Sequence, residues 1–339
     1  MRQTQIKDEV LREICRGETV SGGMLASKFG VSRAAVWKAV ESLRAEGYFI
    51  SGLGGGYLLA PQNTRLCGEQ MSALLGENII FKDETISTNE DLKQIAEAGG
   101  EEFTTVVARR QTGGKGRLGR RFESPEGGLY FSVLLRPDIP AQASLKITTA
   151  AAAAMAAAIE KVASKEAKIK WVNDIYISDK KVCGILTEGV FDAENNSRLK
   201  YCVLGVGVNV GAPKGGFPAE IKDRAGTLFE AAKVPSLVFC ALLGEFLARF
   251  KEYYAEIEKM PHIGEYRRRS YLDGMEITYE RDGKTRTATV YGTGDGAELL
   301  VKEKRKIIPL TSGEVEISVN PAKAGGKAAK ARERRKKAR

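Results

Sequence analysis

The sequence predicts an α+β protein built from several domains, because three different patterns follow one another along its 339 residues. Short helical stripes fill the first part, strands then alternate with helices, and the part after Ser270 contains strand-like segments. A single hydrophobic core rarely extends over a chain of this length. We therefore expect domains at residues 1–62, 63–270 and 271–320, followed by a basic tail at 321–339.

Residues 1–62 predict three short helices and a hairpin. Two apolar stripes at helical spacing precede Gly30, which ends the second helix. Ser32 can cap the third helix, whose apolar positions are Val36, Val40 and Leu43. The glycine-rich segment YFISGLGGGYLLA then predicts a hairpin. This order is that of a winged helix-turn-helix, whose second helix enters the major groove of DNA.

The third helix supplies the candidate DNA contacts, at Ser32, Arg33, Ala34, Trp37 and Lys38. Arginine and lysine at such positions reach phosphates and base edges. A three-helix packing module without a DNA role stays open as an alternative, since outward basic side chains occur on any helix. The hairpin directly after the helix favours DNA binding, so operator DNA is an expected partner.

The middle of the chain predicts one sizeable mixed sheet. Its strand-like segments, rich in β-branched and aromatic residues, are TTVVARRQ, GLYFSVLL, AKIKWVNDIYI, KVCGILTEGVF and KYCVLGVGVNV. The Ala-rich helix at 145–162 is expected to pack on one face of this sheet. Five strand-like segments after Ser270 predict a small β-barrel.

Composition and charge exclude several classes of protein. An apolar fraction of 43% and a charged fraction of 28% argue against a disordered or membrane protein. Lys146 and Glu160 interrupt the Ala-rich stretch, and acids occupy the N-terminus where a signal peptide needs an apolar core. We expect a cytoplasmic protein without membrane contact. The net charge of +10 comes mostly from residues 323–339, which hold nine Lys or Arg and one Glu and predict a disordered, solubilising tail rather than a specific site.

Cysteine and histidine usage limits the chemistry. No CxxC pair occurs, so neither a disulfide frame nor a structural metal site is expected. The five cysteines are Cys15, Cys67, Cys183, Cys202 and Cys240. His262 is the only histidine, which argues against a catalytic triad. The reaction must depend on Lys, Arg and carboxylates.

The densest motif is QTGGKGRLGRR at residues 111–121. It contains a G-x-G-x-x-G at Gly114, Gly116 and Gly119, but a turn and a strand follow instead of a helix, and no Ser or Thr follows the GK. Dinucleotide and Walker-type phosphate loops are therefore excluded. Glycines mixed with four basic side chains suit a carboxylate and a phosphate. A solvated basic loop and a nucleic-acid contact stay open as alternatives.

Two strand segments carry further candidates. Lys181 follows a predicted turn, from which it can point into a site, although a surface lysine fits equally well. Asp174 is either a turn residue or, beside a basic site, a Mg²⁺ ligand. Gly205 and Gly207 lie two apart and clear one face of a strand that ends at Asn209. Tight packing between sheet and helix would also explain these glycines.

Together these motifs resemble the bacterial biotin protein ligases. STN at 87–89, QTGGKGRLGRR, KWVND, KKVCGIL and GVGVN occur in that family's order, and the N-terminal domain resembles the repressor form of the family. The likeness spans about residues 5–319. It implies that biotin and ATP are substrates, with Mg²⁺, and that biotinyl-5'-AMP passes biotin to a lysine of biotin carboxyl carrier protein. It also implies a biotin-responsive repressor that forms a homodimer when loaded with biotinyl-AMP.

The resemblance also implies roles for particular residues. The biotin-binding set would be Ser87, Thr88, Asn89, Gln111, Gly114, Lys115, Gly116, Arg117 and Lys181. Lys181 and Arg117 would be the catalytic cations, and Asp174 and Asn209 would manage ATP and Mg²⁺. Lys115 departs from the arginine that the family often has, which would weaken loop ordering or adenylate retention.

Two alternatives to the ligase stay open. A lipoate or octanoyl transfer enzyme of the same fold would use Cys183 as its nucleophile, although a buried, inert cysteine is the simpler interpretation. A transcription factor with a ligand-sensing, ligase-like domain would bind without turnover. The family's aromatic cover for adenine has only Phe217 as a counterpart, in GAPKGGFPAE.

Overall fold

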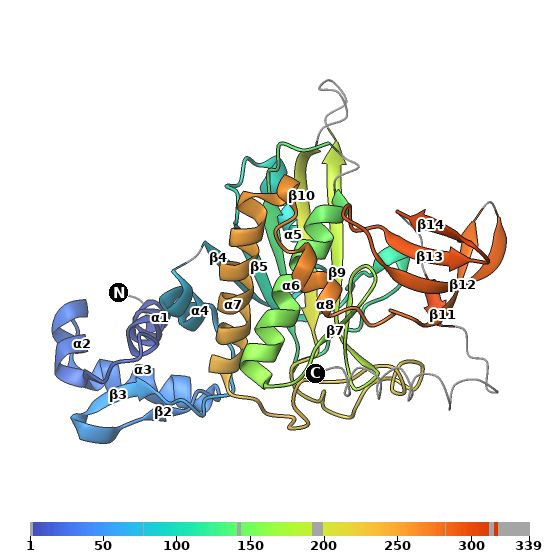
Figure 1. Ribbon diagram of the computed structural model, residues 1–339. Helices are drawn as coiled ribbons and strands as arrows, with labels where there is room; N and C mark the ends of the chain where they lie inside the picture. Colours follow the sequence, from blue (N-terminus) through green and yellow to red (C-terminus); the bar gives the residue numbers. More distant parts are fainter. Residues whose placement is uncertain are drawn as a thin grey trace.

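The computed structural model describes residues 3–76, 78–140, 144–191, 199–281, 283–311 and 315–317. A helical N-terminal part, a central sheet covered by helices and a small C-terminal sheet follow one another along the chain (Figure 1). The predicted α+β class is confirmed. The basic tail at 321–339 lies outside the described residues.

The N-terminal part contains the predicted three helices and hairpin. Its elements are α1 (Gln3–Ile14), β1 (Val20–Ser21), α2 (Gly22–Phe29), α3 (Arg33–Ala45), β2 (Ile50–Ser51), the 3-10 turn Leu53–Gly55 and β3 (Gly56–Leu59). Ser32 Oγ accepts a hydrogen bond from the Ala35 N–H at 3.1 Å, which is the predicted cap of α3. Val36, Val40 and Leu43 are buried against α1 and α2 as expected.

The central sheet has seven strands in the described part of the chain. They are β4 (Ile79–Thr85), β5 (Thr105–Gln111), β6 (Leu129–Leu135), β7 (Lys168–Lys170), β8 (Asp174–Ile177), β9 (Lys180–Phe191) and β10 (Leu199–Val208). Their order is β4-β5-β6-β10-β9-β8-β7. β4 and β5 pair in parallel and the other pairs are antiparallel, so the sheet is mixed as predicted.

Helices cover both faces of this sheet. They are α4 (Gly68–Leu75), α5 (Thr88–Glu97), α6 (Ser144–Ala163), α7 (Ser236–Ala255) and α8 (Ile263–Arg268), with 3-10 turns at Arg117–Gly119 and Ile257–Lys259. The long helices α6 and α7 share one face, and the shorter α5 lies on the other (Figure 1). Alternation along β5 shows this directly, since Val107 joins the α6–α7 core and Val106 packs with α5.

The Ala-rich helix α6 is buried between the sheet and α7. Every side chain from Ile147 to Ala156 is buried, because alanine lets the two helices and the sheet approach closely. Among the described residues, no helix has both the length and the apolar character needed to cross a bilayer.

The C-terminal part is a five-stranded antiparallel sheet. Its strands are β11 (Glu276–Arg281), β12 (Lys284–Thr293), β13 (Leu299–Glu303), β14 (Lys306–Leu310) and β15 (Val315–Ile317), in the order β14-β13-β12-β11-β15. The predicted small β domain is present. Within the described residues β14 and β15 are its two edges, so the sheet is open rather than closed into a barrel. Trp171 Nε1 donates to Ala297 O at 2.9 Å and ties this sheet to the central one.

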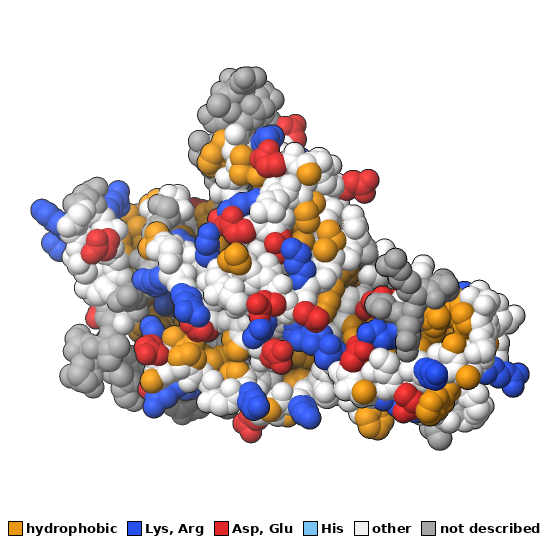
Figure 2. Space-filling view, turned by 180° about the vertical axis from the view of Figure 1, so that it is seen from behind, with side chains coloured by type: hydrophobic (Ala, Val, Ile, Leu, Met, Phe, Trp, Pro, Cys, Tyr) orange, Lys and Arg blue, Asp and Glu red, His pale blue; other side chains and the backbone are white. Residues whose placement is uncertain are grey.

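Basic and acidic side chains lie next to each other over the middle of the face in Figure 2. This mixture agrees with a chain whose excess positive charge lies mostly in its tail, because residues 323–339 alone carry nine Lys or Arg. Anion binding is therefore expected at local clusters of cations rather than over one broad positive surface.

Candidate active site

A cavity of about 540 Å³ opens on the α5 side of the central sheet. The start of α5, the glycine-rich loop after β5, strands β8 to β10 and strand β15 contribute its walls. All nine residues of the proposed biotin set lie in or beside it. Ser87, Thr88, Asn89, Gln111, Lys115, Gly116, Arg117 and Lys181 line the cavity, and Gly114 lies next to Lys115 in the loop.

The floor of the cavity is a patch of glycines on neighbouring strands. Gly207 of β10 pairs with Gly184 of β9, and Gly205 lies two residues along the same face. A Cβ on Gly205 would lie 2.2 Å from Asn89 Oδ1, and one on Gly207 would lie 2.4 Å from the Phe122 ring. These positions therefore require glycine. Gly184 was not predicted, because its partner in the sheet becomes known only from the strand register.

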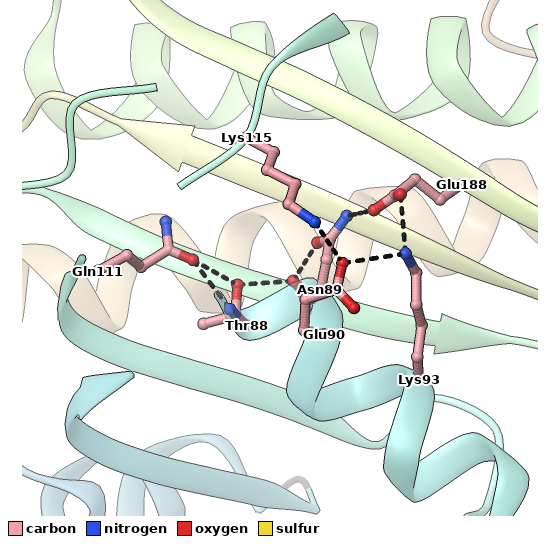
Figure 3. A network of polar contacts seen from close by, with 8 residues as sticks. Thr88, Asn89, Glu90, Lys93, Gln111, Lys115 and Glu188 are labelled. Atoms are coloured by element: carbon pink, nitrogen blue, oxygen red, sulfur yellow. Dashed lines mark hydrogen bonds and ion pairs between the residues drawn. The ribbon is translucent and has the colours of Figure 1, made fainter. Parts of the chain in front are cut away.

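A buried polar wall stands at the start of α5. The Gln111 Oε1 accepts hydrogen bonds from the Thr88 N–H at 2.9 Å and the Thr88 hydroxyl at 3.1 Å. The Ser132 hydroxyl lies 2.7 Å from Thr88 Oγ1 and 2.5 Å from Asn89 Oδ1. Figure 3 shows the Gln111 amide directed at Thr88, and the Asn89 amide directed at Glu188. This wall presents amide and hydroxyl groups in fixed orientations to a polar ligand.

The glycine-rich loop forms a tight hairpin beside the cavity. The Gly116 N–H donates to Arg120 O at 2.7 Å, and the Phe122 N–H donates to Gly114 O at 2.9 Å. A Cβ on Gly114 would lie 2.5 Å from Phe122 O, so the hairpin needs glycine there. Leu118, with φ 54° and 77% exposure, is at its tip. The loop brings its basic side chains to one wall of the cavity.

Cations and one carboxylate converge at the loop side. Lys181 Nζ lies 2.6 Å from Asp174 Oδ1 and 5.9 Å from the centre of the Phe122 ring. Arg117 Nη1 donates to Asn173 Oδ1 at 3.3 Å. Two cations beside a glycine floor form a site suited to an anion.

Asp174 is the residue at which the fit of a metal ion can be judged. Its Oδ1 atom is buried and accepts no aligned hydrogen bond from the described residues, although Lys181 pairs with it as an ion. No group of three or more His, Cys, Asp or Glu able to hold a metal occurs in the described part of the chain. One carboxylate beside a phosphate site is the donor set that Mg²⁺ commonly uses, so the residues fit this ion.

Asn209 and Phe217 both border the cavity. The Asn209 side-chain amide donates to Gly226 O at 3.0 Å, and its N–H donates to Val182 O at 2.8 Å. These bonds fix its orientation at the end of β10. Phe122 is the aromatic residue that the sequence analysis missed, since only the folded hairpin places it against Gly184 and Gly207.

Cys183 lies on the other side of β9. Its side chain is fully buried in the core formed with α6 and α7, and burial raises the pKa of its thiol. A thiol nucleophile needs access and a lowered pKa. Cys183 has neither, which agrees with the simpler interpretation of a buried, inert cysteine.

The five candidate DNA contacts all lie on the solvent side of α3. Ser32, Arg33, Ala34, Trp37 and Lys38 are exposed, and Trp37 is 54% exposed. An exposed tryptophan on a basic helix next to a hairpin is typical of a contact surface rather than of a packing module. The helix therefore presents a continuous basic and aromatic face.

Protein-family models match both the N-terminal helical part and the part that forms the central sheet. The profile described as the Biotin/lipoate A/B protein ligase family matches residues 81–209, and an HTH domain profile matches residues 9–58. Fold and site thus define a protein ligase domain preceded by a helix-turn-helix domain.

Similarity to individual proteins identifies the family within this class. The chain is 38% identical to the bifunctional ligase/repressor BirA of Bacillus spizizenii over 94% of this chain and 100% of that protein. It is 29% identical to the Escherichia coli protein of the same name, over 62% of this chain and 65% of that one. The Aquifex aeolicus biotin protein ligase, solved with biotin and ATP, is 29% identical, covers 70% of this chain and 97% of its own, and has a TM-score of 0.57. The chain belongs to the family of bifunctional biotin protein ligases and repressors.

Proposed function

We propose that this protein joins biotin to ATP, releasing pyrophosphate, and then transfers biotin from biotinyl-5'-AMP to a lysine of biotin carboxyl carrier protein. The observation that carries the proposal is the convergence of Lys181 and Arg117 over a floor of glycines that faces the Thr88–Gln111 wall. Family membership supports it. The roles of individual residues below are part of the same proposal.

The first step requires two anions to meet. A carboxylate oxygen of biotin attacks the α-phosphorus of ATP, and the bond from that phosphorus to the bridging oxygen breaks as pyrophosphate leaves. Lys181 supplies a compact, movable charge between the two anions, and Arg117 can hold a phosphate or carboxylate through two parallel N–H donors. Fixed cations stabilise the charge that builds up on the phosphoryl oxygens.

Lys181 has a carboxylate partner before any anion arrives. Its 2.6 Å contact with Asp174 Oδ1 holds the ammonium group in a half-buried position beside the cavity. Asp174 would hold Mg²⁺, which would supply positive charge against the repulsion between the two anions.

The cavity wall orients the vitamin. Thr88, Asn89 and Gln111 present buried hydrogen-bonding groups to its polar ring, and the floor at Gly205 and Gly207 lets the ligand lie against backbone. In the second step a carrier lysine attacks the acyl carbon and AMP leaves. The adenine would lie toward Asn209 and Phe217.

The helix-turn-helix domain supports a second activity, repression of transcription. We propose that α3 binds operator DNA through Arg33, Trp37 and Lys38, that the adenylate favours a homodimer, and that the protein acts in the cytoplasm. Two copies would present two recognition helices to two half-sites.

A lipoate or octanoyl transfer reaction is the alternative chemistry on this fold. It would require a thioester at Cys183, which faces the α6–α7 core. Incubating the protein with biotin, MgATP and a carrier domain should add one biotin to the carrier, as read by mass spectrometry, with Cys183→Ser as active as wild type. A carrier that gains no biotin but gains octanoate when an octanoyl thioester donor is added, with that activity lost in Cys183→Ser, would reject the ligase.

A further inference from the structure

Glu90 connects the glycine-rich loop to helix α5. Its carboxylate Oε1 lies 2.8 Å from Nζ of Lys115 in the loop and 3.3 Å from Nζ of Lys93, one turn further along α5. Figure 3 shows both ammonium groups directed at this carboxylate. A loop residue and a helix residue thus share one acid.

The network continues from Glu90 into the cavity wall. Lys93 Nζ also lies 2.8 Å from Glu188 Oε1, and Glu188 Oε2 accepts a hydrogen bond from Asn89 Nδ2 at 2.6 Å. Asn89 in turn contacts Ser132 at 2.5 Å. The loop and the wall proposed to hold biotin are therefore joined by one chain of charges and hydrogen bonds.

The hairpin is also attached at its other side. Arg117 contacts Asn173, which lies between β7 and β8, while Lys115 contacts Glu90 at the start of α5. One cation therefore reaches each rim of the cavity. The loop lines the cavity between these two contacts.

We infer that Glu90 is a positioning residue that holds the glycine-rich loop across the cavity through Lys115, with Lys93 and Glu188 fixing its carboxylate. The inference rests on the proposed ligase function and adds a residue that no family motif supplied. It also gives Lys115 a role in holding the loop through Glu90, whereas the family resemblance implied only ligand contact.

The strength of this contact suits a loop that opens and closes. The side chains of Lys115 and Glu90 are 52% and 38% exposed, so solvent screens their attraction. The hydrogen bond from Lys115, followed by that from Lys93, holds the pKa of Glu90 below its ordinary value, so the pair persists at neutral pH. Losing such a pair changes an opening equilibrium by about threefold rather than by orders of magnitude.

A purely local role for Glu90 would give a different result. An acid in the first turn of a helix stabilises that helix whatever the loop does. A Glu90→Gln substitution would then act equally in the presence and absence of Lys115. A double-mutant cycle separates these cases.

The test measures hydrogen–deuterium exchange of amides 112–122 in the full-length protein without ligand. Glu90→Gln and Lys115→Gln should each speed exchange by about threefold, and the double variant should be no faster than either single one. Glu84→Gln removes a similarly exposed acid on β4, paired with Arg110, and should leave loop exchange unchanged. High salt should speed exchange in wild type but not in Glu90→Gln.

The dissociation rate of biotinyl-adenylate is a second measurement, and it links the Glu90–Lys115 contact to the proposed reaction. Biotinyl-adenylate should dissociate from Glu90→Gln about threefold faster than from wild type. When Lys115→Gln is already present, adding Glu90→Gln should not change the dissociation rate. Additive effects on exchange, or unchanged exchange in Glu90→Gln, would overturn the inference even in an active enzyme. Absence of adenylate in wild type would instead reject the proposed function and leave the exchange result to decide the contact.

Discussion

Asn63 Nδ2 donates a hydrogen bond to Ser236 Oγ at 2.9 Å, across the junction between the N-terminal helical part and helix α7. Asn63 Oδ1 accepts from the Phe49 N–H at 3.1 Å, and the Asn63 amide also donates to Arg65 O at 2.8 Å. One fully buried side chain thus holds the hairpin side of the DNA-binding domain against the first turn of α7.

Asn63→Ala should weaken this junction. It leaves the part-buried Phe49 N–H and Arg65 carbonyl without their partner, which costs about 1–3 kcal/mol of unfolding free energy. Urea denaturation measures the effect, and Gln62→Ala, at the exposed neighbouring position, is the matched control. Equal stability of the two variants would show that the amide does not hold the junction.

Gly205→Ala should impair biotin binding. The new methyl group would lie 2.2 Å from Asn89 Oδ1 and displace a side chain that is hydrogen-bonded to Glu188. We expect affinity for biotin to fall about tenfold or more, with about 1–3 kcal/mol of destabilisation from overpacking. Calorimetric titration checks this. Gly189→Ala on β9, where the methyl group would meet the Leu199 side chain and the Phe191 ring rather than a residue of the cavity wall, should keep wild-type affinity.

His262 should make the fold sensitive to acid. It is fully buried, its Nε2 lies 2.9 Å from Thr149 Oγ1, and burial followed by the charge of Lys146 lowers its pKa to about 4. The unfolded chain, with a pKa near 6.5, binds more protons between these values. Stability is therefore full above pH 6.5 and falls as pH drops toward 4, by about 3 kcal/mol in all.

The check on His262 is the slope of unfolding free energy against pH. His262→Gln should flatten the slope between pH 4 and 6.5, even if it is less stable at neutral pH. A variant with the wild-type slope would assign the acid sensitivity to other groups.

Lys38→Ala should weaken DNA binding, because it removes a cation proposed to contact a DNA phosphate. Removing one exposed cation from α3 should reduce affinity for duplexes selected from a random library by about threefold to tenfold, and make the salt dependence shallower by about one ion. Lys302→Ala, on the exposed side of β13, serves as control. If both variants bind with equal affinity and salt slope, α3 is not the reading element.

Local patterns predicted much of this structure. The Ser32 cap, the alternating strands and the basic loop depend on residues close in sequence, and each is found where the chain predicted it. Glu90, Phe122 and Gly184 were missed. Their importance arises from neighbours that only the fold brings together, such as Lys115 for Glu90.

Strand β9 shows why sequence alone could not assign side chains to the two faces of the sheet. Lys181 and Cys183 are two apart and would share a face on a regular strand. The pairing with β8 shifts between Ile175 and Tyr176, opposite this segment, so that the Lys181 side chain lies by the cavity while the Cys183 side chain is fully buried in the core. Such a bulge changes which residues share a face of the strand, and no residue pattern in this segment predicts it.

Lys181 is the residue proposed to bring the biotin carboxylate and the α-phosphate of ATP together. Adenylation is measured directly as pyrophosphate release from biotin and MgATP, without a carrier. Wild type should form biotinyl-adenylate, and Lys181→Ala should be slower by about a hundredfold or more, while Lys180→Ala at the exposed neighbouring position keeps its rate. Lack of adenylate in wild type, or equal rates for Lys181→Ala and wild type, would show that Lys181 does not have this role.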